Sequence, residues 1–325
     1  MFVKLRTFRV LLQNSLRTVS WGMNAPEKTG LGIDAGGSSS RWVLVSSTGT
    51  VLGEGRSGPL TGHIFSADDP DEQLGRFVEM LEAARAVCPP DALAAGITGL
   101  HPGTLAAELF RRAVTETLGL TAQRAVIGND MHVAFASAFG PGEGVLVYAG
   151  TGSVAYHETA TGEAVRAGGY GYLIDDAGAG YWLGHEALRA LFRLVDSGQS
   201  ADTPLATALY GRLGSRVWSE IMPVVYGGGR SFVASLAPAV TEAERAGDGE
   251  ARALLERAGA ELARLAQTVQ GRLGAALPVA FAGGVTRLSP VLTRSLETHL
   301  GASVRVVEGE PVYAAARLAL QLVKN

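Results

Sequence analysis

Lysine is nearly missing from this chain of 325 residues. Only Lys4, Lys28 and Lys324 are lysines, and all three lie near the ends of the sequence. A P-loop uses the lysine of its GK[ST] motif to hold phosphates, and a Schiff-base enzyme needs a buried lysine. The body of the chain can supply neither. Any nucleotide phosphate bound here must therefore be held by backbone N–H groups and a metal ion.

Cysteine and long hydrophobic runs are also scarce. Cys88 is the only cysteine, which excludes a disulfide framework, a cysteine-rich zinc site and an iron–sulfur cluster held by one chain. A single cysteine fits the reducing cytoplasm, where we expect the protein. No hydrophobic run approaches the roughly 18 residues that span a bilayer. The net charge is −3 without a basic stripe, so we expect neither a membrane nor a nucleic acid as partner.

Two stretches of the sequence resemble each other, LGIDAGGSSSRWVLVSSTGTVLGEGRSG at 31–58 and VLVYAGTGSVAYHETATGEAVRAGGYG at 145–171. Each alternates apolar strands with a Gly/Ser turn and then a Thr-Gly turn, which is typical of antiparallel hairpins. Because the pattern occurs twice, it indicates a duplicated domain.

Helical and strand patterns alternate after each meander. The spacing predicts helices at 104–119, 131–139, 179–196, 201–222, 231–246, 250–273, 289–300 and 311–323, and a further helix capped by Asp68 or Asp69. Strands are predicted at 92–98, 124–128, 278–283 and 303–309. This alternation predicts mixed sheets flanked by helices. Two such units would enclose a cleft that suits a ligand.

Two glycine-rich turns occupy matching places in the two meanders. The first is Gly36-Gly37-Ser38-Ser39, preceded by Asp34, and the second is Gly150-Thr151-Gly152-Ser153. Such a turn brings backbone N–H groups close to an anion, and Asp34 could hold a hydrated Mg²⁺ beside it. A plain hairpin turn explains each stretch alone equally well or better, but the recurrence favours phosphate binding.

Three other motifs are candidates for a site. Gly283-Gly284-Val285, between a strand and a helix, lets a flat ring approach the backbone, although tight packing explains the glycines as well. Asp130 ends a strand and could accept a hydroxyl proton, although a helix cap is the commoner role. Gly-, Tyr- and Asp-rich residues 167–184 suit a sugar, which offers hydroxyls and an apolar ring face.

These motifs, in this order, resemble the sugar-kinase branch of the actin/hexokinase/Hsp70 superfamily, and more narrowly the N-acetylglucosamine kinases within the BadF/BadG/BcrA/BcrD-type ATPase group. The resemblance runs from about Leu31 to the C-terminus. It implies an α/β fold of two duplicated actin-like (ribonuclease H-like) domains, with mixed sheets flanked by helices and the active site in the cleft between the domains. We expect an extension at 1–29 that is disordered, domains at 30–140 and 141–310, and a C-terminal helix at 311–325 that completes the first domain.

The resemblance also implies roles for single residues. Gly36, Gly37, Ser38 and Ser39 match the first phosphate motif, Gly150 to Ser153 the second, and Gly283, Gly284 and Val285 the adenosine motif. Asp130 matches the catalytic base, and Asp34 begins the first phosphate motif. The sugar contacts are expected from His63, Asp130, Thr151, Gly169, Tyr170 and Asp176.

The sequence departs from the family pattern in four places. Ser38 replaces the usual Thr, and Tyr170 a usual Trp. Asp175-Asp176-Ala177-Gly178-Ala179 stands where Gly-Asp-Glu-Gly-Ser is usual, and Thr61-Gly62-His63 where some members have Thr-Asn-His. Phosphoryl transfer is therefore better supported than the identity of the sugar.

We expect an ATP- and Mg²⁺-dependent kinase of an amino sugar, N-acetylglucosamine or glucosamine, acting on the C6 hydroxyl. Its partner would be the small-molecule sugar, with a homodimer as one option for the oligomeric state. The alternatives are an ATPase of the dehydratase-activator type that lacks an iron–sulfur cluster, and a non-catalytic sugar-binding regulator.

Overall fold

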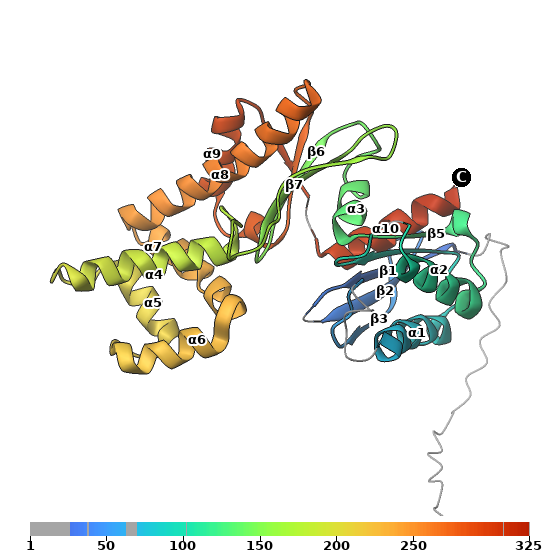
Figure 1. Cartoon of the computed structure of the whole chain (residues 1–325), viewed down its shortest axis with the longest axis horizontal. Helices are drawn as coiled ribbons and strands as arrows, with labels where there is room; N and C mark the ends of the chain where they lie inside the picture. Colours follow the sequence, from blue (N-terminus) through green and yellow to red (C-terminus); the bar gives the residue numbers. More distant parts are fainter. Residues whose placement is uncertain (1–26, 38, 63–69, 102, 308, 325) are drawn as a thin grey trace, which may run out of the picture.

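The computed structural model describes residues 27–37, 39–62, 70–101, 103–307 and 309–324. It contains two five-stranded mixed sheets with helices on their faces (Figure 1). The first sheet has the order β3-β2-β1-β4-β5, with β1 Thr29–Ala35, β2 Ser40–Ser46, β3 Val51–Ser57, β4 Ala92–Ile97 and β5 Ala125–Gly128. The second has the order β10-β9-β6-β7-β8, with β6 Val145–Ala149, β7 Ser153–Glu158, β8 Ala164–Gly168, β9 Val279–Ala282 and β10 Val304–Val306.

The two sheets have the same topology. In each, three antiparallel strands form a meander (β1–β2–β3 and β6–β7–β8), and two later strands extend the sheet in parallel from the first strand of that meander. The duplication that the sequence indicated is therefore confirmed, as is the mixed α/β class.

Helices cover both faces of the first sheet. They are α1 Pro70–Val87, α2 Leu105–Leu118, α3 Asp130–Ala136 and α10 Pro311–Lys324, with a short helix η2 at Ala122–Arg124. One set of alternating side chains, including Leu31 and Ile33, packs on α1 and α2, where the rings of Phe77 and Phe110 meet with centroids 4.9 Å apart. Val43 and Val45 point to the opposite face and pack on α10. This alternation is the period-2 geometry of a strand.

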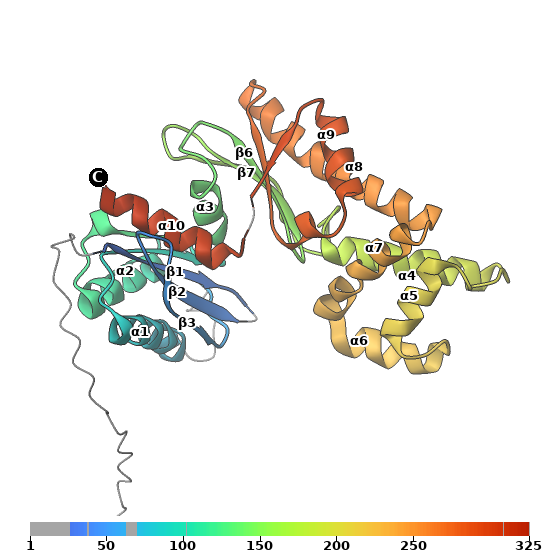
Figure 2. The ribbon, with the colours of Figure 1, turned by 180° about the vertical axis from the view of Figure 1, so that it is seen from behind.

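The last helix of the chain therefore packs on its first strand. A Cβ atom on Gly30 would lie 2.7 Å from the Ala316 carbonyl oxygen, and one on Gly32 would lie 2.2 Å from that of Val312. These distances are shorter than real contacts, so only glycine lets α10 approach β1 this closely. Figure 2 shows α10 and β1 from behind, with α3 between the two sheets.

The second domain adds a larger helical layer. Its helices are α4 Gly180–Asp196, α5 Pro204–Leu213, α6 Trp218–Ser235, α7 Ala237–Arg245, α8 Gly249–Leu273 and α9 Pro290–Leu300, with η3 at Gly284–Arg287. The predicted helices at 201–222 and 231–246 were wrong in their bounds. Gly214, at φ 76°, ends α5 in a left-handed cap, and α6 runs from Trp218 through Pro223 and a kink to Ser235.

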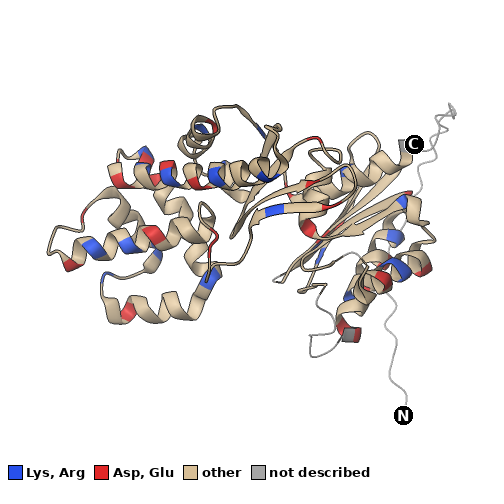
Figure 3. Cartoon of the chain, turned by 45° about the horizontal axis from the view of Figure 1, so that its top comes forward, with Lys and Arg blue, Asp and Glu red and all other residues tan. Residues whose placement is uncertain are grey.

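Charged residues of both signs are spread over both domains (Figure 3). Among the helices that the structure describes, none has the length and apolar character needed to cross a membrane. The expected helix cap at Asp68 or Asp69 and residues 1–26 of the extension expected at 1–29 lie outside the described residues, and Thr29 already belongs to β1.

Candidate active site

Asp130 is the first residue of α3, the helix that lies between the two sheets. The preceding Asn129 is the helix N-cap, and its side-chain oxygen accepts a hydrogen bond from Met131 N at 2.8 Å. Asp130 is therefore not needed as the cap, which was its commoner expected role. Its Oδ2 accepts a hydrogen bond of 2.9 Å from the Thr98 hydroxyl, and its Oδ1 accepts one of 3.0 Å from Met131 N.

Burial and hydrogen bonding act in opposite directions on the pKa of this carboxyl group. Desolvation raises the pKa of Asp130, against the lowering effect of the Thr98 and backbone hydrogen bonds. A carboxylate with a raised pKa is a better proton acceptor than an ordinary surface aspartate.

Asp34 lies at the end of β1, in the neighbourhood of Asp130. Burial first, then the charge of Asp130, raise the pKa of Asp34 to about 6, whereas Arg41 acts in the opposite direction. Arg41 stands opposite Asp34 in the β1–β2 register and forms an ion pair with Glu310. Two largely buried carboxyl groups, one of which raises the pKa of the other, make a site that attracts a cation.

Tyr148 from the second sheet faces the same pair of carboxyl groups. Desolvation, followed by the charges of Asp34 and Asp130, raises the pKa of Tyr148 to about 12. Its hydroxyl therefore stays protonated at neutral pH and can act as a hydrogen-bond donor.

The first glycine turn, after β1, is held by backbone hydrogen bonds. Gly36 N donates to the Ser39 carbonyl at 3.1 Å, and the Gly36 carbonyl accepts from Leu60 N at 3.0 Å. A Cβ on Gly36 or Gly37 would meet no atom of the described chain closer than 3.6 Å. Packing within the described chain thus does not require these two glycines, and the space beside them is open to a ligand.

The second glycine turn, after β6, is held by the segment that leads into α4. Gly180 N donates to the Gly150 carbonyl at 2.9 Å, and Tyr181 N donates to the Thr151 carbonyl at 3.2 Å. The hydroxyl of Ser153, where β7 begins, donates to the Ala177 carbonyl at 2.8 Å. The first amides of α4 therefore fix this turn.

Gly283 ends β9 directly against the second turn. Its φ is +99°, and a Cβ there would lie 2.3 Å from the Ala149 carbonyl oxygen. A side chain is therefore excluded by both conformation and contact. Gly283 brings the following residues, Gly284 and Val285, beside Gly150.

A pocket of about 430 Å³ opens at this junction. Gly150 and Thr151 line one part of it, and Gly284, Val285 and Leu288 another. Its remaining wall comes from α4, α6 and α7: Gly180, Ser231, Ala234, Ser235, Ala237 and Pro238. The second turn and the Gly283-Gly284-Val285 motif, which the sequence placed far apart, thus share one cavity.

The residues expected near the sugar have mixed environments. Gly169, at φ 72°, starts the loop after β8, and Tyr170 is 59% exposed with Arg166 over its ring. Asp176 is only 2% exposed. Its Oδ1 accepts from Ser153 N at 3.2 Å and its Oδ2 accepts from Arg230 at 3.1 Å, so in this structure it supports the second turn.

Two expected residues, Ser38 and His63, lie outside the described residues. The neighbour of His63, Gly62, explains one departure from the family pattern. A Cβ on Gly62 would lie 2.3 Å from the Leu100 Cα, so the asparagine of some family members has no room here.

Sequence reasoning missed Thr98, Tyr148 and Arg230. Thr98 was detectable, because it follows a parallel strand at the edge where Asp34 and Asp130 also lie. Tyr148 matches Asp34 in the repeat, one residue before the end of its strand. Arg230 follows a kink inside α6, and no sequence pattern pairs it with Asp176.

Comparisons with known proteins agree with this architecture. The chain is 27% identical over 242 residues to an N-acetylmuramic acid/N-acetylglucosamine kinase of Clostridium acetobutylicum, covering 71% of this chain and 76% of that protein. It is 26% identical over 316 residues to an N-acetyl-D-glucosamine kinase of Dictyostelium discoideum, covering 90% and 98% of the two chains.

A solved structure assigned as an N-acetylglucosamine kinase, from Chromobacterium violaceum, superposes with a TM-score of 0.63 at 26% identity and covers 90% of this chain and 99% of that one. The sheets and helices of this chain accordingly form two actin-like domains. The profile of the BadF/BadG/BcrA/BcrD ATPase family matches residues 31–315. The chain belongs to the BadF/BadG/BcrA/BcrD ATPase family.

Proposed function

We propose that this protein is a sugar kinase, which transfers the γ-phosphoryl group of ATP to the C6 hydroxyl of N-acetylglucosamine or glucosamine. The observation that carries the proposal is the position of Asp130. It is a largely buried carboxyl group with a raised pKa, at the start of α3, where Asn129 serves as the helix cap and the Thr98 hydroxyl donates to one carboxylate oxygen. The kinase names of the relatives support the same reaction class.

In the proposed reaction the C6 oxygen attacks the γ-phosphorus atom, and its proton passes to the Asp130 carboxylate. The bond to the β-phosphate oxygen breaks, and ADP leaves. Thr98 holds one carboxylate oxygen so that the other stays close to the sugar. Little covalent chemistry is asked of the protein, because phosphoryl transfer depends mainly on positioning and charge neutralisation.

The nucleotide would be divided between the two domains. The turns at Gly36–Ser39 and Gly150–Ser153 would surround the triphosphate with backbone N–H groups, and the pocket beside Gly284 and Val285 would take adenosine. Asp34 fits a Mg²⁺ that keeps several waters and binds phosphate, because one or two carboxylates are its usual protein ligands. When bound, Mg²⁺ would neutralise phosphate charge.

The sugar would lie beside Asp130 and Thr151, against the Gly169–Tyr170 loop. Tyr170 offers an exposed aromatic face to the apolar side of a pyranose ring. Asp176 would act on the sugar indirectly, because it is only 2% exposed and supports the second turn through Ser153 N.

The decisive experiment is a coupled ADP-release assay with N-acetylglucosamine, glucosamine, N-acetylmuramic acid and glucose. We expect sugar-dependent ADP release, with an N-acetylated sugar among the best substrates, and NMR of the product should locate the phosphate on C6. ATP hydrolysis that no sugar accelerates would contradict the proposal and favour the activator-type ATPase. Sugar binding without turnover would favour a regulator.

A further inference from the structure

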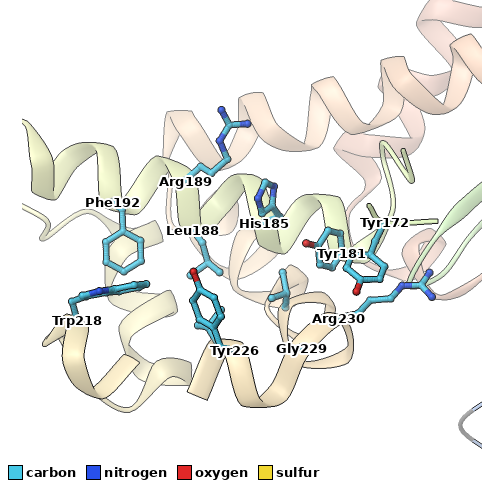
Figure 4. A pocket seen from close by; sticks show the side chains of 12 residues that line it. Tyr172, Tyr181, His185, Leu188, Arg189, Phe192, Trp218, Tyr226, Gly229 and Arg230 are labelled. Atoms are coloured by element: carbon cyan, nitrogen blue, oxygen red, sulfur yellow. The ribbon is translucent and has the colours of Figure 1, made fainter. Parts of the chain in front are cut away.

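One cavity in the described part of the chain lies outside the site built above. It has a volume of about 580 Å³ and lies between α4 and α6 of the second domain (Figure 4). A cavity of this size is in the range that holds a small organic ligand. The proposed kinase reaction leaves it without a role.

Aromatic side chains dominate its walls. Phe192 and Trp218 meet edge to face with ring centroids 5.2 Å apart, and Tyr181 stacks on His185 at 5.8 Å. Tyr226 is 75% exposed and Trp218 is 49% exposed, so their rings are open to an incoming molecule. Exposed aromatic faces grouped around a cavity typically mark a ligand site.

The charged groups of this cavity are basic. Among its lining residues in the described chain are Arg189, Arg230 and His185, and no carboxylate. Figure 4 shows the Arg189 guanidinium directed away from the cavity along the outer side of α4, whereas Arg230 marks its end beside Tyr172. The Arg230 guanidinium lies 5.6 Å from the Tyr172 ring centroid. An anion at this end would meet the same guanidinium that donates to Asp176, so the two acceptors would compete for it.

The same residues connect this cavity with the nucleotide pocket. Arg230 holds Asp176, and Asp176 accepts the Ser153 N–H at the end of the second turn. One helix also lines both cavities, because Arg230 and Val233 of α6 face this one while Ser231 and Ala234 face the nucleotide pocket. Gly229 interrupts that helix at φ 54°, ψ −147°, a conformation that only glycine adopts readily.

From these contacts we infer that the cavity between α4 and α6 is a second ligand site, for a small organic anion with a ring, and that its occupation weakens nucleotide binding. The ring lies against Tyr226, four residues before Arg230 on α6, and the anion binds Arg230, while Trp218 lines the other end of the same cavity. Because the anion competes with Asp176 for Arg230, it loosens the support of the Gly150–Ser153 turn. The nucleotide part of this inference rests on the proposed function, whereas the ligand site does not.

The ligand site is tested first, without nucleotide, by following tryptophan fluorescence during titration. Benzoate and its neutral isostere benzamide form one pair, and glucuronate and glucuronamide form another, so the arms separate an aryl from a sugar source. We expect at least one anion to bind about tenfold more tightly than its amide, the value of one charged hydrogen bond. The Trp218→Phe variant should lose the signal. If neither anion gives a saturable change in fluorescence, or if neither binds more tightly than its amide, the proposed ligand site is contradicted.

Variants separate the parts of the site. Tyr226→Ala should weaken binding of the effective anion and of its amide alike, with Val224→Ala on the same helix but outside the lining as its control. Arg230→Gln should remove the preference for the anion over the amide. Arg189→Gln, whose guanidinium points away, should retain it. Equal behaviour of the two arginine variants would overturn the assigned anion position.

The coupling is tested by measuring the affinity for a non-hydrolysable ATP analogue with and without the saturating anion. We expect an affinity about fivefold lower with the anion, and by reciprocity the same factor on anion binding with the analogue. The matching amide should have no such effect. Unchanged analogue affinity in the presence of bound anion would refute the coupling, and failure of the analogue to bind at all would instead contradict the proposed function.

Discussion

The two halves of this molecule share one topology and differ in the chemistry at matching positions. Asp34 and Tyr148 each precede the last residue of the first strand in their sheet. One is a buried carboxyl group with a pKa of about 6, and the other a phenol with a pKa of about 12. Both halves therefore contain the hairpin, whereas the carboxylates Asp34 and Asp130 are both in the first half. The first half suits cation and proton chemistry, and the second half holds the cavities of about 580 and 430 Å³.

The turns of the two halves are also supported differently. Backbone hydrogen bonds from Leu60 and within the turn hold the first. The second depends in addition on the side chain of Asp176, an aspartate at φ 66° that is itself held by Arg230. A single side-chain substitution can therefore disturb the second turn, whereas among the described residues no side chain forms a hydrogen bond to the first turn.

The largest effect is expected at Asp130, the proposed proton acceptor of the first half. Asp130→Asn keeps the shape and removes the base, so kcat should fall by roughly 10²–10⁴-fold with little change in sugar affinity. Steady-state ADP release measures both. Asp202→Asn, at an exposed ion pair of the second domain, is the matched control and should be active. Turnover near that of the parent would leave Asp130 with a structural role only.

The next effect is expected at Asp34 and has two parts. Asp34→Asn should raise the Mg²⁺ concentration needed for activity. It should also stabilise the fold at pH 8, by up to about 3 kcal/mol for a pKa raised from 3.8 to about 6. Because the folded pKa exceeds the unfolded one, ionisation destabilises the parent above pH 6, and the difference should vanish below about pH 4.

Urea unfolding at the two pH values tests this sign. In the parent, kcat/KM at limiting Mg²⁺ should fall as the pH drops through about 6, because a protonated Asp34 cannot bind the cation. A stability gain that is equal at pH 4 and pH 8 would argue against the raised pKa.

A smaller effect is expected at Asp176, the side chain that supports the second turn and has no described counterpart at the first. Asp176→Asn keeps an acceptor for Ser153 N but loses the ion pair with Arg230, whose side chain is 40% exposed. The partial exposure limits the loss of stability to about 1–2 kcal/mol. We expect KM for ATP to rise several-fold with kcat less affected. The neighbouring Asp175→Asn variant is the control. Equal KM values for ATP in the two variants would contradict the role of Asp176 in supporting the second turn.

The smallest effect is expected at Tyr148, the counterpart of Asp34. Tyr148→Phe should change kcat by no more than about threefold, because a protonated phenol supplies at most one neutral hydrogen bond. Tyr156→Phe in the adjacent strand, whose pKa burial also raises to about 12, is the control. A loss as large as that of Asp130→Asn would mean that both halves take part in the chemistry.

The sequence predicted the repeated meanders because glycine turns and strand alternation are local signals. It placed Asp130 at a strand-to-helix junction for the same reason. The bounds of α5 and α6 escaped it, because a cap at Gly214 and a kink at Gly229 are set by the packing of helices on one another.

The partners of the site residues escaped it more completely. Asp176 matched a sugar-binding position, yet its hydrogen bonds to Ser153 and Arg230 join segments 23 and 54 residues apart. Likewise, the pKa of Asp34 depends on burial and on Asp130, neither of which a linear pattern reports.

The packing of α10 on β1 has a consequence for the order in which the chain can fold during synthesis. In the described structure, α10 covers the bare sheet surface at Gly30 and Gly32. The whole second domain is therefore synthesised before α10 can complete the packing of the first domain. During most of translation one face of the first sheet therefore lacks α10. A chain that stops before α10 leaves this surface exposed to other proteins.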